Sequence, residues 1–67
     1  MEHTVVWKLR PGDMIVMRSF DGAIARVSLV IAITHVGRKY DRVTVVNDHG
    51  VESWKLHSGD QYEVIRH

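Results

Sequence analysis

The sequence predicts a small all-β fold, and three observations carry this prediction. The 67-residue chain contains several short runs in which apolar and polar residues alternate, which is the periodicity of a strand with one buried face. Turn-forming residues separate these runs at close spacing, a pattern typical of antiparallel sandwiches and barrels. The longest run of low charge is rich in β-branched side chains, which favour strands over helices.

The turns divide the chain into five or six antiparallel strands and no helix. Pro11 fixes its own φ angle and Gly12 accepts a positive φ, so the Pro11-Gly12 pair predicts the first turn. Asn47 to Gly50 is a hairpin signal between two strand-like runs. Trp7 and Trp54 are in phase with apolar neighbours, so both are expected to pack in the core. The predicted strands are residues 4–9, 14–18, 23–36, 40–46, 51–57 and 61–65.

The run over residues 23–36 is predicted to be one long strand, bent near Ser28 or Ala32, on which the other strands pack. Two short strands joined by a kink are the alternative. The odd-numbered positions are all apolar and are expected to face the core: Ala23, Ala25, Val27, Leu29, Ile31 and Ile33. If the even positions face outward, Ile24, Val30 and Ala32 form an exposed apolar strip, and such strips mark interfaces.

Four segments of the chain carry a resemblance to a known class of domain. They are the LRPGDMIV opening at residues 9–16, the long strand, the hairpin over residues 43–54 and the YEVI close at residues 62–65. Their order resembles that of small SH3-like barrels, in the broad sense that includes KOW-type, Tudor-like and short phage-encoded domains. The resemblance implies a single barrel domain over residues 1–67 and an accessory protein of phage origin. A closed sheet also suits so small a chain, because closure removes exposed edges.

Composition excludes several classes of protein. The chain has no cysteine, so it has neither disulfides nor thiolate metal sites, and its formal net charge is only +1. Its start does not resemble a signal peptide. The run over residues 23–36 contains Arg26 and is shorter than the roughly 20 apolar residues that cross a bilayer. We therefore expect a cytoplasmic protein without a membrane partner.

No catalytic or metal-binding residues are predicted, and no cofactor is expected. The His57-Ser58-Gly59-Asp60 turn contains the residue types of a hydrolytic triad, but contiguous residues rarely bring a base to a hydroxyl. Structural zinc needs four convergent ligands, usually including a closely spaced pair. No two of the five histidines are that close in the sequence; they are His3, His35, His49, His57 and His67.

The function expected from the sequence is a non-enzymatic interaction module that binds another protein or copies of itself. The candidate interface residues are Phe20, Ile24, Val30 and Ala32. Phe20 lies in a polar loop, where it serves either as a contact anchor or as a plug that folds back over the barrel end. The plug is the favoured interpretation.

A nucleic-acid-binding barrel is the alternative function. Residues 38–42 (RKYDR) place three cations around one aromatic ring, a combination that contacts phosphates and stacks on bases. A solvated hairpin tip, with Asp41 partly neutralising its neighbours, is the competing interpretation and is favoured because the overall charge is small. The residues of this candidate site are Arg26, Arg38, Lys39, Tyr40, Arg42 and Lys55.

Overall fold

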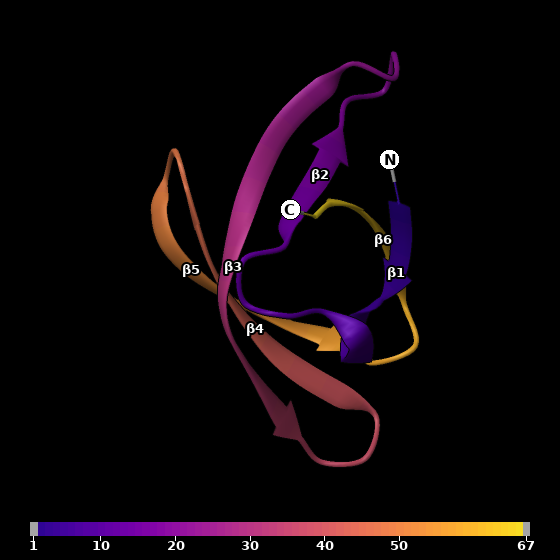
Figure 1. Ribbon diagram of the computed structural model, residues 1–67, viewed down its shortest axis with the longest axis vertical. Helices are drawn as coiled ribbons and strands as arrows, with labels where there is room; N and C mark the ends of the chain where they lie inside the picture. Colours follow the sequence, from indigo (N-terminus) through magenta and orange to yellow (C-terminus); the bar gives the residue numbers. More distant parts are fainter. Residues whose placement is uncertain (1, 67) are drawn as a thin grey trace.

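The computed structural model describes residues 2–66, which form six strands and one short 3-10 helix (Figure 1). The all-β class predicted from the sequence is therefore confirmed. The strands meet their neighbours in antiparallel pairs within a single sheet. In chain order the elements are β1 (Glu2–Val5), η1 (Val6–Lys8), β2 (Met14–Arg18), β3 (Ile24–Val36), β4 (Tyr40–Asn47), β5 (Gly50–His57) and β6 (Gln61–Ile65).

The sheet curls around an interior but does not close. Its strand order is β1-β6-β2-β3-β4-β5, so β1 and β5 are edges that do not pair with each other. The expectation of a closed barrel was wrong, and η1 is the physical reason. After Val5 the chain leaves the sheet, and its next two amides bond to the turn after β5: Val6 N donates to Asp60 O and Trp7 N to Ser58 O.

The same helix corrects the predicted position of Trp7. In a 3-10 helix, side chains three residues apart lie above one another, whereas in a strand the repeat is two. Val6 and Leu9 are consequently buried, while the Trp7 side chain is 57% exposed. The Lys8 ammonium lies 5.1 Å from the centre of the Trp7 ring, so this indole carries a cation contact at the surface.

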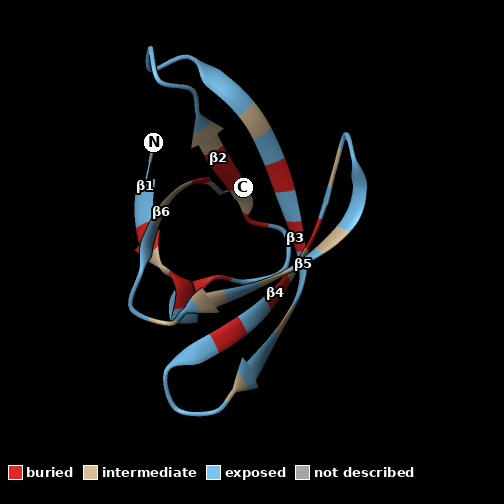
Figure 2. Cartoon of the chain, turned by 180° about the vertical axis from the view of Figure 1, so that it is seen from behind, coloured by how far each residue is buried: buried red, intermediate tan, exposed pale blue. Residues whose placement is uncertain are grey.

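The core lies inside the curl and is built mainly from aliphatic side chains (Figure 2). Ile15 on β2 is fully buried and lies opposite Ser28 and Val64 in the two neighbouring strands. Trp54 packs against this core while remaining partly exposed, as the sequence predicted. The buried core residues are Val6, Leu9, Ile15, Val30, Val43, Val45 and Val64.

The long strand β3 presents the opposite face to the one predicted. Ser28 and Val30 are buried, whereas the odd-numbered residues Val27, Leu29 and Ile31 are exposed. The polar Ser28 is accommodated inside because Asn47 Nδ2 donates a hydrogen bond to its Oγ at 3.0 Å. Val30 therefore belongs to the core and not to an exposed strip.

A β-bulge in β3 restores the predicted face in the last part of the strand. Val30 pairs with Val45 and Ala32 pairs with Thr44, so Ile31 is an extra residue without a partner. A bulge bends its strand and shifts the alternation by one residue. Ile33 consequently points inward opposite Val43 and packs on the core. The predicted bend near Ala32 coincides with this bulge.

Candidate functional site

The outer face of the sheet, on the side away from the core, carries a row of apolar side chains. Residues directly opposite each other in an antiparallel ladder point to the same face. The ladder places Leu29 between Met14 and Val46, and Val46 opposite Val51. We call these four residues the outer apolar row. Val51, at the sheet edge, is 68% exposed, and Leu29 and Val46 are partly exposed.

Farther along β4 and β5, the same face carries a basic cluster of Tyr40, Arg42, Lys55 and His57. Tyr40 lies opposite His57, and Arg42 lies opposite Lys55. The Lys55 ammonium is 4.9 Å from the centre of the Tyr40 ring, a distance at which a cation is attracted to the ring face. The Tyr40 and His57 rings meet edge to face, with centroids 5.6 Å apart.

The structure brings together only some of the predicted basic residues. Arg38 and Lys39 are exposed in the turn that immediately precedes Tyr40. Arg26 does not join it, because its guanidinium lies 3.5 Å from Asp48 and 3.9 Å from Glu52 at the other end of the β4–β5 hairpin. His57 was missed by the sequence analysis, although the hairpin register, counted from Asn47 and Gly50, places it opposite Tyr40.

Asp41 does not neutralise the basic cluster, contrary to the expectation for this hairpin. It alternates with Tyr40 and Arg42 and therefore points to the inner side, where it is fully buried. Its Oδ1 lies 2.5 Å from His35 Nδ1, and its Oδ2 has no hydrogen-bond partner among residues 2–66. Glu52, the carboxylate of β5, also faces the inner side, opposite Val45. Within β4 and β5, no carboxylate shares the outer face with the cations.

Phe20 is fully exposed at the tip of the β2–β3 hairpin, so the expectation that it plugs the barrel end was wrong. The loop beneath it is fixed by hydrogen bonds. Ser19 N donates to Ala23 O at 2.8 Å, and Gly22 N donates to Ser19 O at 2.9 Å. Asp21 Oδ1 accepts from Ser19 Oγ and from Ala23 N, and these bonds hold the pKa of Asp21 below its ordinary value.

The base of this hairpin is tied to β6 by one arginine. Arg18 donates from Nε and Nη2 to the two carboxylate oxygens of Glu63, at 2.8 and 2.9 Å. Its Nη1 donates to Gly22 O at 2.7 Å. A bidentate arginine–carboxylate pair fixes geometry as well as charge. Arg18 thus connects the loop that presents Phe20 to the body of the sheet.

The Arg18–Glu63 pair gives the fold a dependence on pH. The hydrogen bond from Arg18 holds the pKa of Glu63 below its ordinary value of 4.5. The stabilisation that the ionised Glu63 side chain provides is therefore present above pH 4.5, and it is lost as the pH falls through the folded-state pKa of Glu63. We expect the melting temperature of Glu63→Gln to fall less steeply over this acidic range than that of the native chain. Thermal denaturation followed by circular dichroism at several pH values measures this. Arg18→Met should flatten the same part of the profile, and parallel profiles for all three proteins would contradict the assignment.

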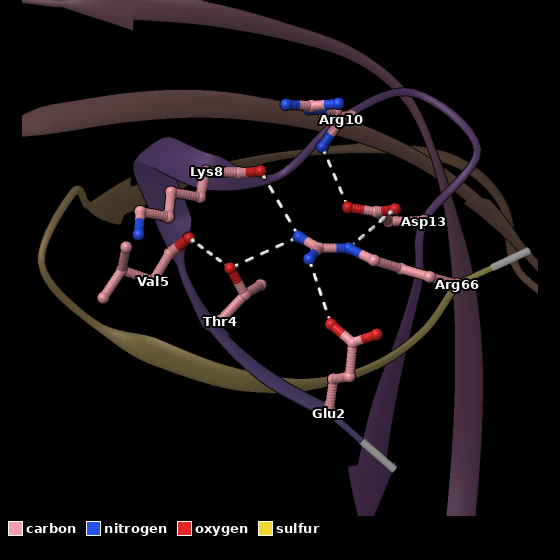
Figure 3. Close-up of polar contacts among 7 residues, drawn as sticks. All are labelled: Glu2, Thr4, Val5, Lys8, Arg10, Asp13 and Arg66. Carbon is pink, nitrogen blue, oxygen red and sulfur yellow. Dashed lines mark hydrogen bonds and ion pairs between the residues drawn. The ribbon is translucent and has the colours of Figure 1, made fainter.

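A pocket is lined by residues 7–13 and Arg66. Figure 3 shows the polar contacts that Arg66 makes there. Arg66 Nε bonds to Asp13 Oδ1 at 3.3 Å, and Nη1 bonds to Glu2 Oε2 at 3.1 Å. Its Nη2 contacts Thr4 Oγ1 and the carbonyl of Lys8. Asp13 Oδ2 accepts from Arg10 N at 3.0 Å. Since Arg66 and Asp13 already pair with each other and with neighbouring groups, we assign this network to holding the Arg10–Asp13 turn against β1 and η1.

Over residues 2–66, no three histidine, aspartate or glutamate side chains gather closely enough to hold a metal ion. His35 contacts Asp41, and His57 Nδ1 accepts from Gly59 N at 3.1 Å. His67 lies outside the described residues. No helix in this range is long and apolar enough to cross a membrane.

Comparison of the chain with protein-family models, with curated proteins and with solved structures found no match in any of the three.

Proposed function

We propose that this chain is a non-enzymatic interaction module that binds another protein through the Phe20 hairpin, residues 19–24. The supporting observation is a fully exposed phenylalanine on a loop held by backbone and side-chain hydrogen bonds. Aromatic anchors dominate the binding energy of many interfaces. A loop that is already ordered loses little conformational entropy on binding, so more of the contact energy is retained. Ile24, also exposed, adds apolar surface to the same hairpin.

Two further features support a protein-binding role. The outer apolar row and Ile31 leave aliphatic side chains exposed on a chain with a small core, and exposed apolar patches mark interaction sites. Of the other predicted interface residues, Ala32 is exposed and Val30 is buried. Membership of the small SH3-like barrels and an origin as a phage accessory protein belong to the same proposal and rest on the sequence segments described above.

Photo-cross-linking at the hairpin tip tests this role. We expect benzoyl-phenylalanine in place of Phe20 to give discrete covalent adducts in a lysate of the native host, and Ile24→Asp to reduce them. An adduct of twice the mass of the chain would identify a second copy as the partner. The same reagent at His49, on the exposed β4–β5 turn, is the control and should give no such adduct. Absence of adducts at both positions, or equal adducts at both, would contradict the proposal.

A second candidate function is nucleic-acid binding through the basic cluster together with Arg38 and Lys39. The observation that favours it is the contact of Lys55 with the Tyr40 ring on a face to which β4 and β5 contribute no carboxylate. Cations that contact phosphates and a ring that stacks on a base bind single strands with little sequence preference.

For this second function we expect a gel-shift titration at low salt to show weak binding of single-stranded oligonucleotides. The binding should weaken steeply as salt is added, because phosphate contacts release counterions. Arg42→Ala and Arg38→Ala should each reduce it. Arg26→Ala is the control, since Arg26 is already paired with Asp48 and Glu52. Equal effects of Arg26→Ala and Arg42→Ala would count against the cluster as the binding surface.

A further inference from the structure

The last strand of the sheet, β5, has a free edge whose exposed backbone groups can be identified. Antiparallel pairs alternate between residues that exchange backbone hydrogen bonds and residues that do not. Ser58 N donates to Lys39 O at 2.7 Å, and the same register continues along the hairpin to Asn47 and Gly50. Every second residue before Ser58 repeats this pairing. The amides and carbonyls of Leu56, Trp54 and Glu52 therefore point toward β4.

The alternate residues Val51, Ser53 and Lys55 therefore direct their backbone N–H and C=O groups away from the sheet. Within residues 2–66, none of these outward groups has a hydrogen-bond partner. The segment contains no proline, and the backbone hydrogen bonds from η1 to the turn after β5 lie beyond it, at Ser58 and Asp60. Residues 51–55 are thus an open template for one more strand.

The two sides of this edge have different chemistry. On the outer side, Lys55 stands beside Arg42 and Tyr40, while Val51 ends the outer apolar row. On the inner side, Trp54 packs on the core and is partly exposed. An added strand therefore meets cations near Lys55 on one side and an incompletely covered indole on the other.

Pairing of β5 with the β5 of a second copy does not satisfy these charges. In a two-fold antiparallel pair, facing residues share one side of the sheet, so they have the same parity in the strand. Glu52 is on the inner side and Lys55 on the outer side, so they cannot face each other in any such register. Lys55 instead meets Val51, Ser53 or another Lys55. Charge complementarity thus favours a partner that brings its own carboxylate.

We infer that residues 51–55 bind an extended, acidic peptide segment of another protein as an additional antiparallel strand. A carboxylate of the segment faces Lys55 on the outer side, and an apolar side chain next to it covers Trp54 on the inner side. Main-chain hydrogen bonds to Val51, Ser53 and Lys55 hold the strand in place. This inference rests on the proposed function as a protein-binding module and names a second surface and the chemistry of the partner.

A capped, net acidic synthetic peptide with the core Glu-Ile-Thr-Gln-Val is a suitable probe. Running antiparallel to β5, it places Glu opposite Lys55, Ile beside Trp54 and Val opposite Val51. Amide exchange followed by NMR reads the result on the full chain. In the free protein, the amides of Val51, Ser53 and Lys55 should exchange rapidly, while those of Glu52 and Trp54 are protected by β4. Saturating peptide should slow exchange at the first three by about tenfold or more.

Two matched changes test register and charge. N-methylation of the peptide Thr removes an amide that faces β5 and should weaken binding about tenfold, whereas N-methylation of Ile removes one that faces away. Lys55→Glu should weaken binding about threefold, and a peptide with Lys in place of Glu should restore it. Arg10→Glu, at an exposed position of the Arg10–Asp13 turn, is the control for net charge and should leave binding unchanged.

Absence of peptide-induced protection at Val51, Ser53 and Lys55 would overturn the inference. So would binding that is equally sensitive to both N-methylated peptides. If an oligothymidylate probe shifts the signals of the basic cluster while no peptide protects these amides, the cluster serves nucleic acid instead. The cross-links expected at Phe20 report on a different hairpin, so a failure at β5 is distinguishable from a failure of the proposed function.

Discussion

Replacing Ile15 with alanine is expected to lower the free energy of unfolding by about 2–5 kcal/mol, because the change removes fully buried atoms and leaves a cavity. Ile15 lies at the centre of the inner face, between Ser28 and Val64. Domains of this size are only marginally stable, so the loss can be a large part of the total. Urea denaturation followed by tryptophan fluorescence measures it, since Trp54 packs on the same core.

Ile31→Ala is the matched control, because it deletes the same atoms from the bulge of β3. Ile31 is 43% exposed, so its loss is expected to cost less than about 1 kcal/mol. The pair also tests which face of β3 is buried, since alternation in the sequence favoured Ile31 as a core residue. A larger effect at Ile31 than at Ile15 would contradict the register of β2 and β3.

His35→Ala is expected to destabilise the fold by about 1–3 kcal/mol, although the His35 side chain is mostly exposed. Its Nδ1 is the hydrogen-bond partner of Asp41 Oδ1, and Asp41 Oδ2 has none within the described part of the chain. Removal of the ring takes a hydrogen-bond partner from a buried carboxyl group, and the cost of its lost hydration is then offset only by water that enters where the ring lay.

A double-mutant cycle separates the energy of the His35–Asp41 contact from the effect of losing the surface area that the histidine ring covers. Asp41→Leu in the His35→Ala background removes the buried polar group at similar volume and should recover much of the lost stability. His49→Ala, at an exposed turn position, is the control and is expected to change stability by less than about 0.5 kcal/mol. If His35→Ala is as mild as His49→Ala, the His35–Asp41 contact does not contribute to stability.

The strands were predictable where short-range chemistry decides them. Pro11-Gly12 and Asn47–Gly50 carry turn signals, and the strands after residue 13 lie close to their predicted bounds. The first predicted strand, residues 4–9, was wrong in its bounds, because β1 ends at Val5 and η1 follows. The buried face of β3 was not predictable, because both parities contain apolar residues and the choice depends on the partners in β2 and β4. The inward Ser28 is stabilised by Asn47 on the neighbouring strand β4, 19 positions away in the sequence, so this contact leaves no local signal. The bulge at Ile31 likewise depends on how β3 pairs with β4 and has no local signal in the sequence.

The candidate site divides in the same way. Tyr40, Arg42 and Lys55 were predicted to lie together because the hairpin register follows from a local turn. The inward direction of Asp41 follows from the same alternation, but its burial depends on distant elements. For Phe20 the less favoured of the two interpretations, an exposed ring, is the one observed, since a residue in a loop has no periodicity that indicates where its ring points. The free edge of β5 depends on η1, which interrupts what the sequence presents as a continuous first strand.

The strand order also constrains when the sheet can assemble. β6, over residues 61–65, lies between β1 and β2 and pairs with both. During synthesis on the ribosome, β1 and β2 therefore emerge before β6, the strand that pairs with both of them. The meander from β2 to β5 can pair as it appears, whereas β1 must wait until β6 has been made. Because pairing of distant segments must first overcome the entropy of closing a long loop, insertion of β6 is expected to be the slow, final step of folding.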